Sequence, residues 1–144
     1  MTGKIHTISI SKRKGIPKSN IESANLIYEH GLEGDVHAGK WHRQVSLLAV
    51  ESIDKMRIKL PNLRAGAFAE NITTQGIDLS KLAVSDKIRV GNNAELEITQ
   101  LGKVCHDKCA IFFRVGDCVM PTEGIFARVI RSGNININDD ITLL

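Results

Sequence analysis

Short apolar segments, each closed by a turn, follow one another along most of the chain. Residues 94–102, AELEITQLG, alternate apolar and polar side chains, which predicts a strand with one buried face. The preceding segment DKIRVG has the same character, and Gly91-Asn92-Asn93 between the two favours a hairpin. Segments of this length and spacing are typical of β-barrels.

The rest of the pattern supports a mainly β fold with a few short helices. Further strands are predicted at 4–10, 43–50 and 138–144, with a short strand or loop at 68–74. Helices are predicted at 51–60, at 105–115 and at 122–133, where Gly133 would end the last one. Residues 20–29 are compatible with a helix or an extended pair, and 12–18 and 31–35 are predicted loops or turns. The spacing is too irregular for repeated βαβ units, so we expect one β-barrel domain over 1–144.

Composition limits the partners and the compartment. No apolar run approaches the about 18 residues of a membrane span, and the N-terminus lacks the apolar core of a signal peptide. We therefore expect a cytoplasmic protein that does not bind a membrane. The net charge of +3 mildly favours anionic ligands, but one Trp, one Tyr and four Phe are few for stacking bases, so no nucleic-acid partner is predicted. The basic run of Lys12, Arg13, Lys14 and Lys18 is predicted to be a solvated loop.

All three cysteines fall in KVCHDKCAIFFRVGDC, residues 103–118. In a reducing compartment thiols stay free unless they do metal or redox chemistry. Cys105, Cys109 and Cys118 with His106 could bind zinc, although this is not a zinc-finger spacing. A thiolate could instead bind molybdenum, or react after neighbouring cations lower its pKa. The alternative is that the three side chains are small buried hydrophobes.

Two other stretches contain candidate binding residues. In GLEGDVHAGKWHRQVSLL, the Arg43 guanidinium, Ser46 and loop N–H groups could hold an oxyanion such as a phosphate. The alternative is a surface ion pair between Arg43 and Asp35, and a lone histidine such as His37 or His42 is more often structural than a ligand.

In FAENITT, Glu70 and Asn71 interrupt an apolar segment and must form hydrogen bonds if buried. Asn71 could bind the edge of a heterocycle, or both residues could satisfy nearby backbone groups. Near the end of the chain, Thr122 and Glu123 are predicted to cap a helix, and Arg128 could face a ligand or the solvent.

Together these blocks resemble the MOSC domain, the family named for the C-terminal part of molybdenum cofactor sulfurases. The resemblance runs from about residue 4 to the end of the chain. It rests on GLEGDVHAG, RQVSLLAVESI, FAENITTQGIDL, LAVSDKIRVG, the cysteine after ITQLGK, and GIFARVIRSGNI. CHDKC followed by GDCVMPTEGIFARV is similar to the small bacterial branch of the family.

The resemblance implies a β-barrel that binds the molybdenum cofactor, a pterin dithiolene with a phosphate. It implies handling of sulfur destined for the metal, or a cysteine ligand of molybdenum, with a cysteine desulfurase or a molybdoenzyme as partner. By position Cys105 is the best counterpart of that cysteine and Cys109 the second. The candidate residues are Cys105 and Cys109 for catalysis, these two and Cys118 for metal, and Arg43, Ser46, Asn71 and His37 for the cofactor.

Some family features are replaced or missing in this chain. Ser85 and Asn138 stand where the family usually has a turn glycine, which should alter turns and leave the site intact. The resemblance extends neither to the pyridoxal-phosphate desulfurase domain of the sulfurases nor to a reductase N-terminal domain, so we expect that this domain can bind or carry without catalysing. The alternatives are a non-catalytic module for cofactor storage or insertion, and a structural zinc protein that uses the three cysteines and His106.

Overall fold

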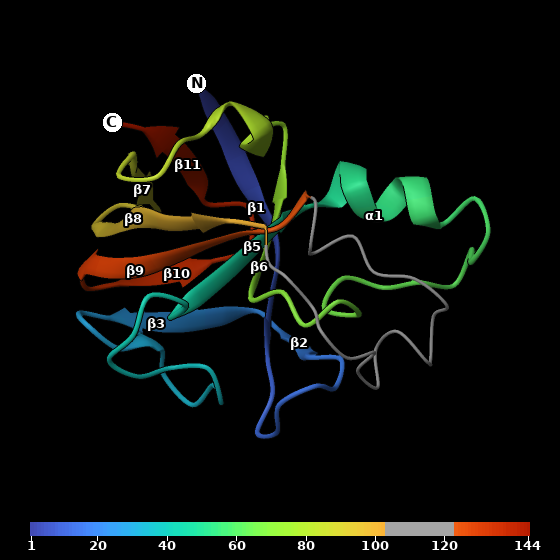
Figure 1. Ribbon diagram of the computed structural model, residues 1–144, viewed down its shortest axis with the longest axis horizontal. Coiled ribbons are helices and arrows are strands. Elements are labelled where there is room, and N and C mark those ends of the chain that lie inside the picture. Colours follow the sequence, from blue (N-terminus) through green and yellow to red (C-terminus); the bar gives the residue numbers. More distant parts are fainter. Residues whose placement is uncertain (103–122) are drawn as a thin grey trace.

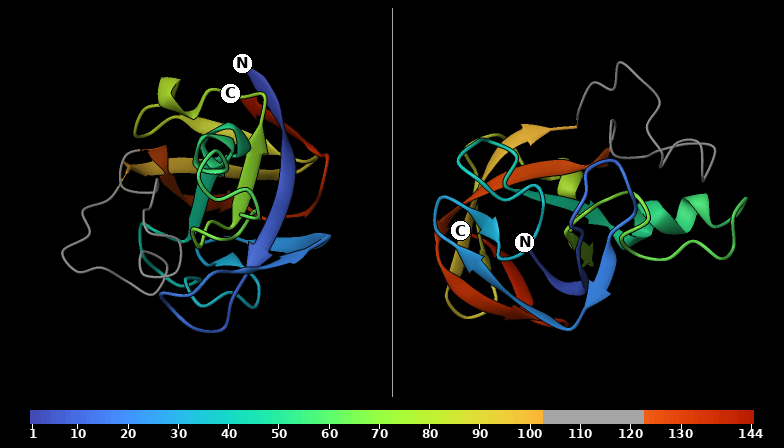
Figure 2. Two further views of the ribbon diagram at one scale, coloured as in Figure 1. Left: turned by 90° about the vertical axis from the view of Figure 1, so that its right-hand side faces the viewer. Right: turned by 90° about the horizontal axis from the view of Figure 1, so that it is seen from below.

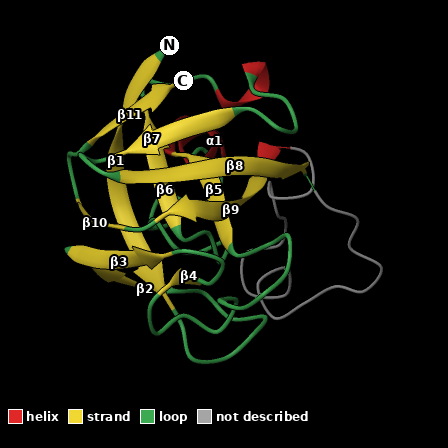
Figure 3. Cartoon of the chain, turned by 90° about the vertical axis from the view of Figure 1, so that its left-hand side faces the viewer, coloured by secondary structure: helices red, strands yellow, loops and turns green. Residues whose placement is uncertain are grey.

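A computed structural model describes residues 1–102 and 123–144. The predicted β-barrel is confirmed (Figures 1 and 3), and in the described residues it is closed by seven strands. Their order around the barrel is β1 (Thr2–Ile10), β11 (Asp140–Leu143), β7 (Lys87–Val90), β8 (Ala94–Leu101), β9 (Ile125–Arg131), β5 (Val45–Ala49) and β6 (Ile72–Gln75), which pairs with β1 again. β2 (Ser19–Ile21) is an additional strand that pairs with the C-terminal part of β1, Ile8 to Ile10.

Alternating apolar side chains fill the barrel. Along β8, Ala94, Leu96 and Ile98 are buried, whereas Glu95 and Glu97 between them are partly exposed. A fully buried Leu or Ile side chain contributes about 1.5–3 kcal/mol to folding, and the methyl group of an Ala contributes less. The predicted hairpin is confirmed as the antiparallel pair of β7 and β8, and the predicted strands at 4–10, 43–50 and 138–144 are confirmed as β1, β5 and β11.

A small second sheet adds to the barrel. It contains β10 (Gly133–Asn136), β3 (Ser23–Ile27) and β4 (Gly31–Leu32). Leu26, Leu32 and Ile135 from this sheet belong to the main hydrophobic core. The sequence left 20–29 open between a helix and an extended pair, and the structure shows the extended form.

The predicted helix at 51–60 is confirmed in a shorter form, α1 (Val50–Met56). It connects β5 to β6, the parallel pair of the barrel, and parallel strands require a crossover connection of this kind. α1 and the chain after it extend from one end of the barrel (Figures 1 and 2). None of the helices in the described ranges combines the length and the apolar character that crossing a bilayer requires.

The helix predicted at 122–133 is wrong, because this segment contains strand β9. Ile125, Ala127 and Val129 lie in the main core, and Phe126 lies in a second cluster outside it. The period of the apolar residues is therefore two, and β-branched side chains favour an extended backbone between β5 and β8.

Candidate functional site

Ser46 and Asn71 form one buried hydrogen-bonded unit on the outer face of the barrel. Asn71 Oδ1 accepts hydrogen bonds from the backbone N–H of Ser46 at 3.0 Å and from Ser46 Oγ at 3.1 Å. Asn71 Nδ2 donates to the carbonyl oxygen of Ser9 at 3.2 Å. The amide thus joins β5, β1 and the start of β6. These contacts agree with the alternative that Asn71 satisfies backbone groups, and a contact with a cofactor stays a prediction.

Glu70 is buried and fully hydrogen-bonded. Its carboxylate accepts from the backbone N–H of Gly66 at 2.8 Å, from that of Phe68 at 3.2 Å and from Thr73 Oγ1 at 2.8 Å. Burial raises the pKa of Glu70, and these hydrogen bonds only partly oppose the shift. The carboxylate therefore holds the loop before β6. This agrees with the predicted alternative that Glu70 satisfies nearby backbone groups.

Lys18 is completely buried, so the prediction that the basic run is a solvated loop is wrong for this residue. Its Nζ lies 2.7 Å from Asp35 Oδ1, and neither side chain of this ion pair is exposed. Arg43 therefore does not pair with Asp35, and the predicted alternative of a surface pair is wrong as well. Lys18 Nζ also lies 2.9 Å from Nδ1 of His37, whose side chain is 25% exposed.

The charges of Lys18 and Asp35 depend on each other. Burial opposes ionisation of Asp35, but hydrogen bonds from Lys18 and from the backbone of Ser11 outweigh it and hold the pKa of Asp35 below its ordinary value. The side-chain amide of Asn71 shifts this pKa in the same direction. Burial lowers the pKa of Lys18, and the hydrogen bond and the charge of Asp35 oppose that shift. Asp35 and Asn71 are bound two residues apart on the same stretch of chain, because the N–H of Ser11 donates to Asp35 Oδ1 at 3.0 Å and Asn71 donates to the carbonyl of Ser9.

Arg43 lies beside this unit with part of its guanidinium available. Its Cζ lies 5.2 Å from the centre of the Phe126 ring, and its Nε donates to Gln100 Oε1 at 3.1 Å. Phe126 is the direct strand partner of Ser46. The two terminal nitrogens of Arg43 form no hydrogen bond within the described part of the chain. His42 lies on the other side of Gln100, with Nε2 at 3.0 Å from the same Oε1.

The structure therefore brings the four predicted cofactor residues, His37, Arg43, Ser46 and Asn71, to one outer region. Its parts meet at residues 9–11, which bind Asp35 and Asn71, and at Phe126, which pairs with Ser46 and contacts Arg43. Sequence reasoning missed two members of it, Lys18 and Gln100. Nothing in the basic run singles out Lys18. Gln100 has the sequence parity of the inward residues of β8, but a β-bulge between Ile98 and Gln100 sets it opposite Phe126 on the outer face.

The same region borders both ends of the segment that carries the cysteines. Gln100 Nε2 donates to the carbonyl oxygen of Gly102 at 2.7 Å, and the N–H of Gly102 donates to the carbonyl of Gly124 at 2.7 Å. The predictions that concern Cys105, Cys109, Cys118, His106, Thr122 and the helix at 105–115 lie outside the described residues. In the residues that are described, no group of three or more His, Cys, Asp or Glu side chains could hold a metal ion.

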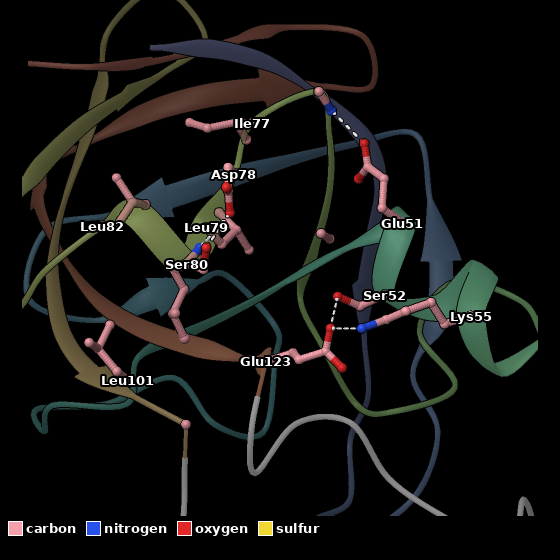
Figure 4. A pocket seen from close by; sticks show the side chains of 15 residues that line it. Glu51, Ser52, Lys55, Ile77, Asp78, Leu79, Ser80, Leu82, Leu101 and Glu123 are labelled. Carbon is pink, nitrogen blue, oxygen red and sulfur yellow. Dashed lines mark hydrogen bonds and ion pairs between the residues drawn. The ribbon is translucent and has the colours of Figure 1, made fainter.

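A pocket of about 690 Å³ opens at the end of the barrel, next to Gly102 and Gly124 (Figure 4). It lies between α1 and the short 3-10 helix η1 (Leu79–Lys81). Apolar side chains that line it are Ile77, Leu79, Leu82, Leu101 and Ile125. At its edge Glu123 Oε1 accepts from Ser52 Oγ at 2.9 Å and from Lys55 Nζ at 2.6 Å. The side chain of Glu123 thus contacts α1, whereas the sequence predicted that it caps a helix at 122–133.

Arg128 neither caps the pocket nor joins the outer region. Its Nε lies 2.8 Å from Glu97 and one terminal nitrogen lies 2.7 Å from Glu29. The sequence left open whether Arg128 faces a ligand or the solvent. In the structure it is partly exposed to solvent and is held by two surface ion pairs.

Comparison with known proteins identifies the family. Solved structures with the same fold include YuaD from Bacillus subtilis, with a TM-score of 0.75, 19% identity, and coverage of 99% of this chain and 96% of that chain. YiiM from Escherichia coli matches with a TM-score of 0.71 and 20% identity, over 100% of this chain and 70% of that chain. YiiM from Geobacillus stearothermophilus matches with a TM-score of 0.74 and 20% identity, over 99% and 75% of the two chains. The comparison with curated proteins gives no match. The family model of the MOSC domain matches residues 34–142, and the chain therefore belongs to the MOSC domain family, which is associated with molybdenum cofactor sulfurases.

Proposed function

We propose that this protein binds the molybdenum cofactor and uses a cysteine thiolate of the 103–118 segment as a metal ligand or as a sulfur carrier. The observation that carries the proposal is the MOSC match over residues 34–142, which includes the members of the outer region from Asp35 to Phe126 but not Lys18. In the cytoplasm such a protein would act together with a cysteine desulfurase or a molybdoenzyme.

The described residues suit the anionic end of this cofactor. The terminal nitrogens of Arg43 can donate two parallel hydrogen bonds to a phosphate, which is the geometry that a guanidinium provides best. The ring of Phe126 supports the guanidinium from one side. His37 is partly exposed and contacts Lys18 and Asp35. The chemistry of Arg43 therefore fits a phosphate group.

Asn71 and Ser46 have a different role in this proposal. The amide of Asn71 already bonds to Ser46 and to the carbonyl of Ser9. We therefore assign to this unit the positioning of the wall beside Arg43, while direct contacts with the phosphate come from Arg43 and His37.

Cys105 is the residue that we assign to the metal or the sulfur, and Cys109 is the second candidate. Cys105 follows Gly102 by three residues, and an extended chain of that length spans at most about 11 Å. As a carrier, the thiolate would take the outer sulfur of a desulfurase persulfide, and the desulfurase cysteine would leave as a thiolate. When it is bound, the cofactor supplies the molybdenum that accepts the thiolate or the sulfur.

The phosphate contact is tested by measuring the pterin that copurifies with the protein from a host that makes the cofactor. Arg43→Met keeps the aliphatic part of the side chain but removes the charged hydrogen bonds, which are worth about 1.5–3 kcal/mol. We expect about tenfold to a hundredfold less pterin per protein. Arg131→Met is the matched control, because Arg131 is exposed, pairs with Glu95 and lies at the other end of β9 from Phe126. Equal pterin in both variants would contradict the role of Arg43.

A further inference from the structure

The buried ammonium of Lys18 has three N–H groups and three neighbours that can accept them. Lys18 Nζ lies 2.7 Å from Asp35 Oδ1, 2.9 Å from His37 Nδ1 and 3.3 Å from Ser11 Oγ. The hydroxyl proton of Ser11 is already used, because Ser11 Oγ donates to the carbonyl of Arg13 at 3.1 Å. Ser11 Oγ must therefore accept from Lys18, and a carboxylate can only accept.

This geometry also determines the protonation of His37. A lysine ammonium donates and cannot accept, so Nδ1 of His37 has to be the acceptor. The imidazole is then neutral and carries its proton on Nε2. We propose that Lys18 and Asp35 are positioning residues that hold His37 in the Nε2–H form, as a hydrogen-bond donor for an anionic oxygen.

The backbone around His37 is fixed as well. Its N–H donates to the second carboxylate oxygen of Asp35 at 3.2 Å, and its carbonyl oxygen accepts from Trp41 Nε1 at 2.7 Å. Asp35 therefore holds both the backbone of His37 and the lysine that contacts its ring. The assignment depends on Nδ1 alone and is independent of what Nε2 contacts.

A buried ion pair is a costly way to stabilise a small barrel. Apolar residues of similar volume are often as stable or more stable than such a pair. The cluster of Ser11, Lys18 and Asp35 is buried, and it reaches the surface at the ring of His37. Setting the tautomer of the partly exposed His37 is a function that apolar packing could not provide.

The ligand class follows from the donor. A neutral Nε2–H suits an oxyanion such as a phosphate oxygen, and a histidine in this form does not use Nδ1 as a base or a metal ligand. The identity of the phosphate as part of the molybdenum cofactor rests on the proposed function. The tautomer does not depend on it and can be measured in the protein without cofactor.

The test is a long-range ¹H–¹⁵N NMR spectrum of protein labelled with ¹⁵N-histidine at neutral pH, with His37→Gln to assign the ring. We expect a single tautomer for His37, with an unprotonated Nδ1 and a protonated Nε2. In Lys18→Met combined with Asp35→Asn, which removes both charges, we expect a mixture of tautomers for His37 and no change for His42. A protonated Nδ1, or a mixture in the wild-type protein, would overturn the assignment even if the variant fails to fold.

Inorganic phosphate is the probe for the donor role. Titration of the cofactor-free protein should shift the Nε2 signal of His37 in a saturable way, and the spectrum of His42→Gln should show the same shift. The absence of a saturable shift would overturn the oxyanion role and leave the tautomer assignment standing. Both results are independent of whether the purified protein contains molybdenum, so failure of the proposed function is recognised separately.

Discussion

Removing the charge of Asp35 should destabilise the protein far more than removing the charge of a comparable surface partner. Asp35→Asn keeps the shape of the side chain but leaves the Lys18 ammonium buried without a counter-charge. Breaking a buried ion pair in this way costs about 3–5 kcal/mol, against a total free energy of unfolding of about 5–15 kcal/mol for a typical domain. With a urea m-value of about 2 kcal/mol/M, the unfolding midpoint should fall by about 2 M.

The pair of Lys4 and Asp140 is the control for this prediction. Its nitrogen and oxygen atoms lie 2.8 Å apart, against 2.7 Å for Lys18 and Asp35. The side chains of the control pair are 59% and 73% exposed, whereas those of the buried pair are 0% exposed. Asp140→Asn should therefore cost less than about 1 kcal/mol.

The pH dependence of the unfolding free energy provides a second test of the Lys18–Asp35 pair. The pKa of Asp35 is lower in the folded protein, so the unfolded chain takes up the proton first as the pH falls. The contribution of Asp35 is thus complete above the ordinary Asp value of about 3.9 and is lost as the pH falls from there through the folded pKa. Asp35→Asn should flatten this part of the stability curve. Equal urea midpoints for Asp35→Asn and Asp140→Asn would refute the reasoning.

Further predictions concern the turns and the buried carboxylate. Ser85 and Asn138 have φ angles of 81° and 71°, so Ser85→Gly and Asn138→Gly should each raise the unfolding free energy by up to about 1 kcal/mol, which thermal unfolding measures. Gly66→Ala should destabilise the protein more than Gly15→Ala in urea unfolding. Both glycines have positive φ, but a Cβ at Gly66 would lie 2.6 Å from a backbone oxygen, whereas a Cβ at Gly15 would meet open space. Equal costs of the two substitutions would count against this close approach. The pKa of Glu70 is raised in the folded protein, so the folded protein keeps this proton to a higher pH than the unfolded chain. Wild-type stability should therefore fall as the pH rises from the ordinary Glu pKa to the folded pKa. Urea midpoints measured across pH should lack this decline in Glu70→Gln.

The barrel could be predicted because its signal is local. Alternation along AELEITQLG and the turn at Gly91 give the hairpin without reference to the rest of the chain. The segment at 122–133 contains Glu, Ala and Arg, which favour a helix, and the burial of β9 between two strands outweighs that preference.

The candidate site could be predicted in part. Arg43 was singled out because a basic strand after glycine turns can hold an oxyanion, and Asn71 because an amide interrupts an apolar segment; their contacts with a cofactor stay predictions. Lys18 was missed because burial of a lysine depends on a partner far along the chain, here Asp35, and on Gly66 allowing the backbone of Lys18 to approach. The turn positions of Ser85 and Asn138 were located by resemblance, and their positive φ angles agree with the glycine that the family usually has there.

The most direct test is the elemental analysis of protein purified anaerobically from a host that makes the molybdenum cofactor, compared with Cys105→Ser. The proposal predicts molybdenum on the wild-type protein and its loss from the variant, or, for a carrier, a cyanide-releasable sulfur on the wild-type protein alone. Zinc near one per chain without molybdenum, with unfolding on chelation, would contradict the proposal and indicate a structural zinc protein.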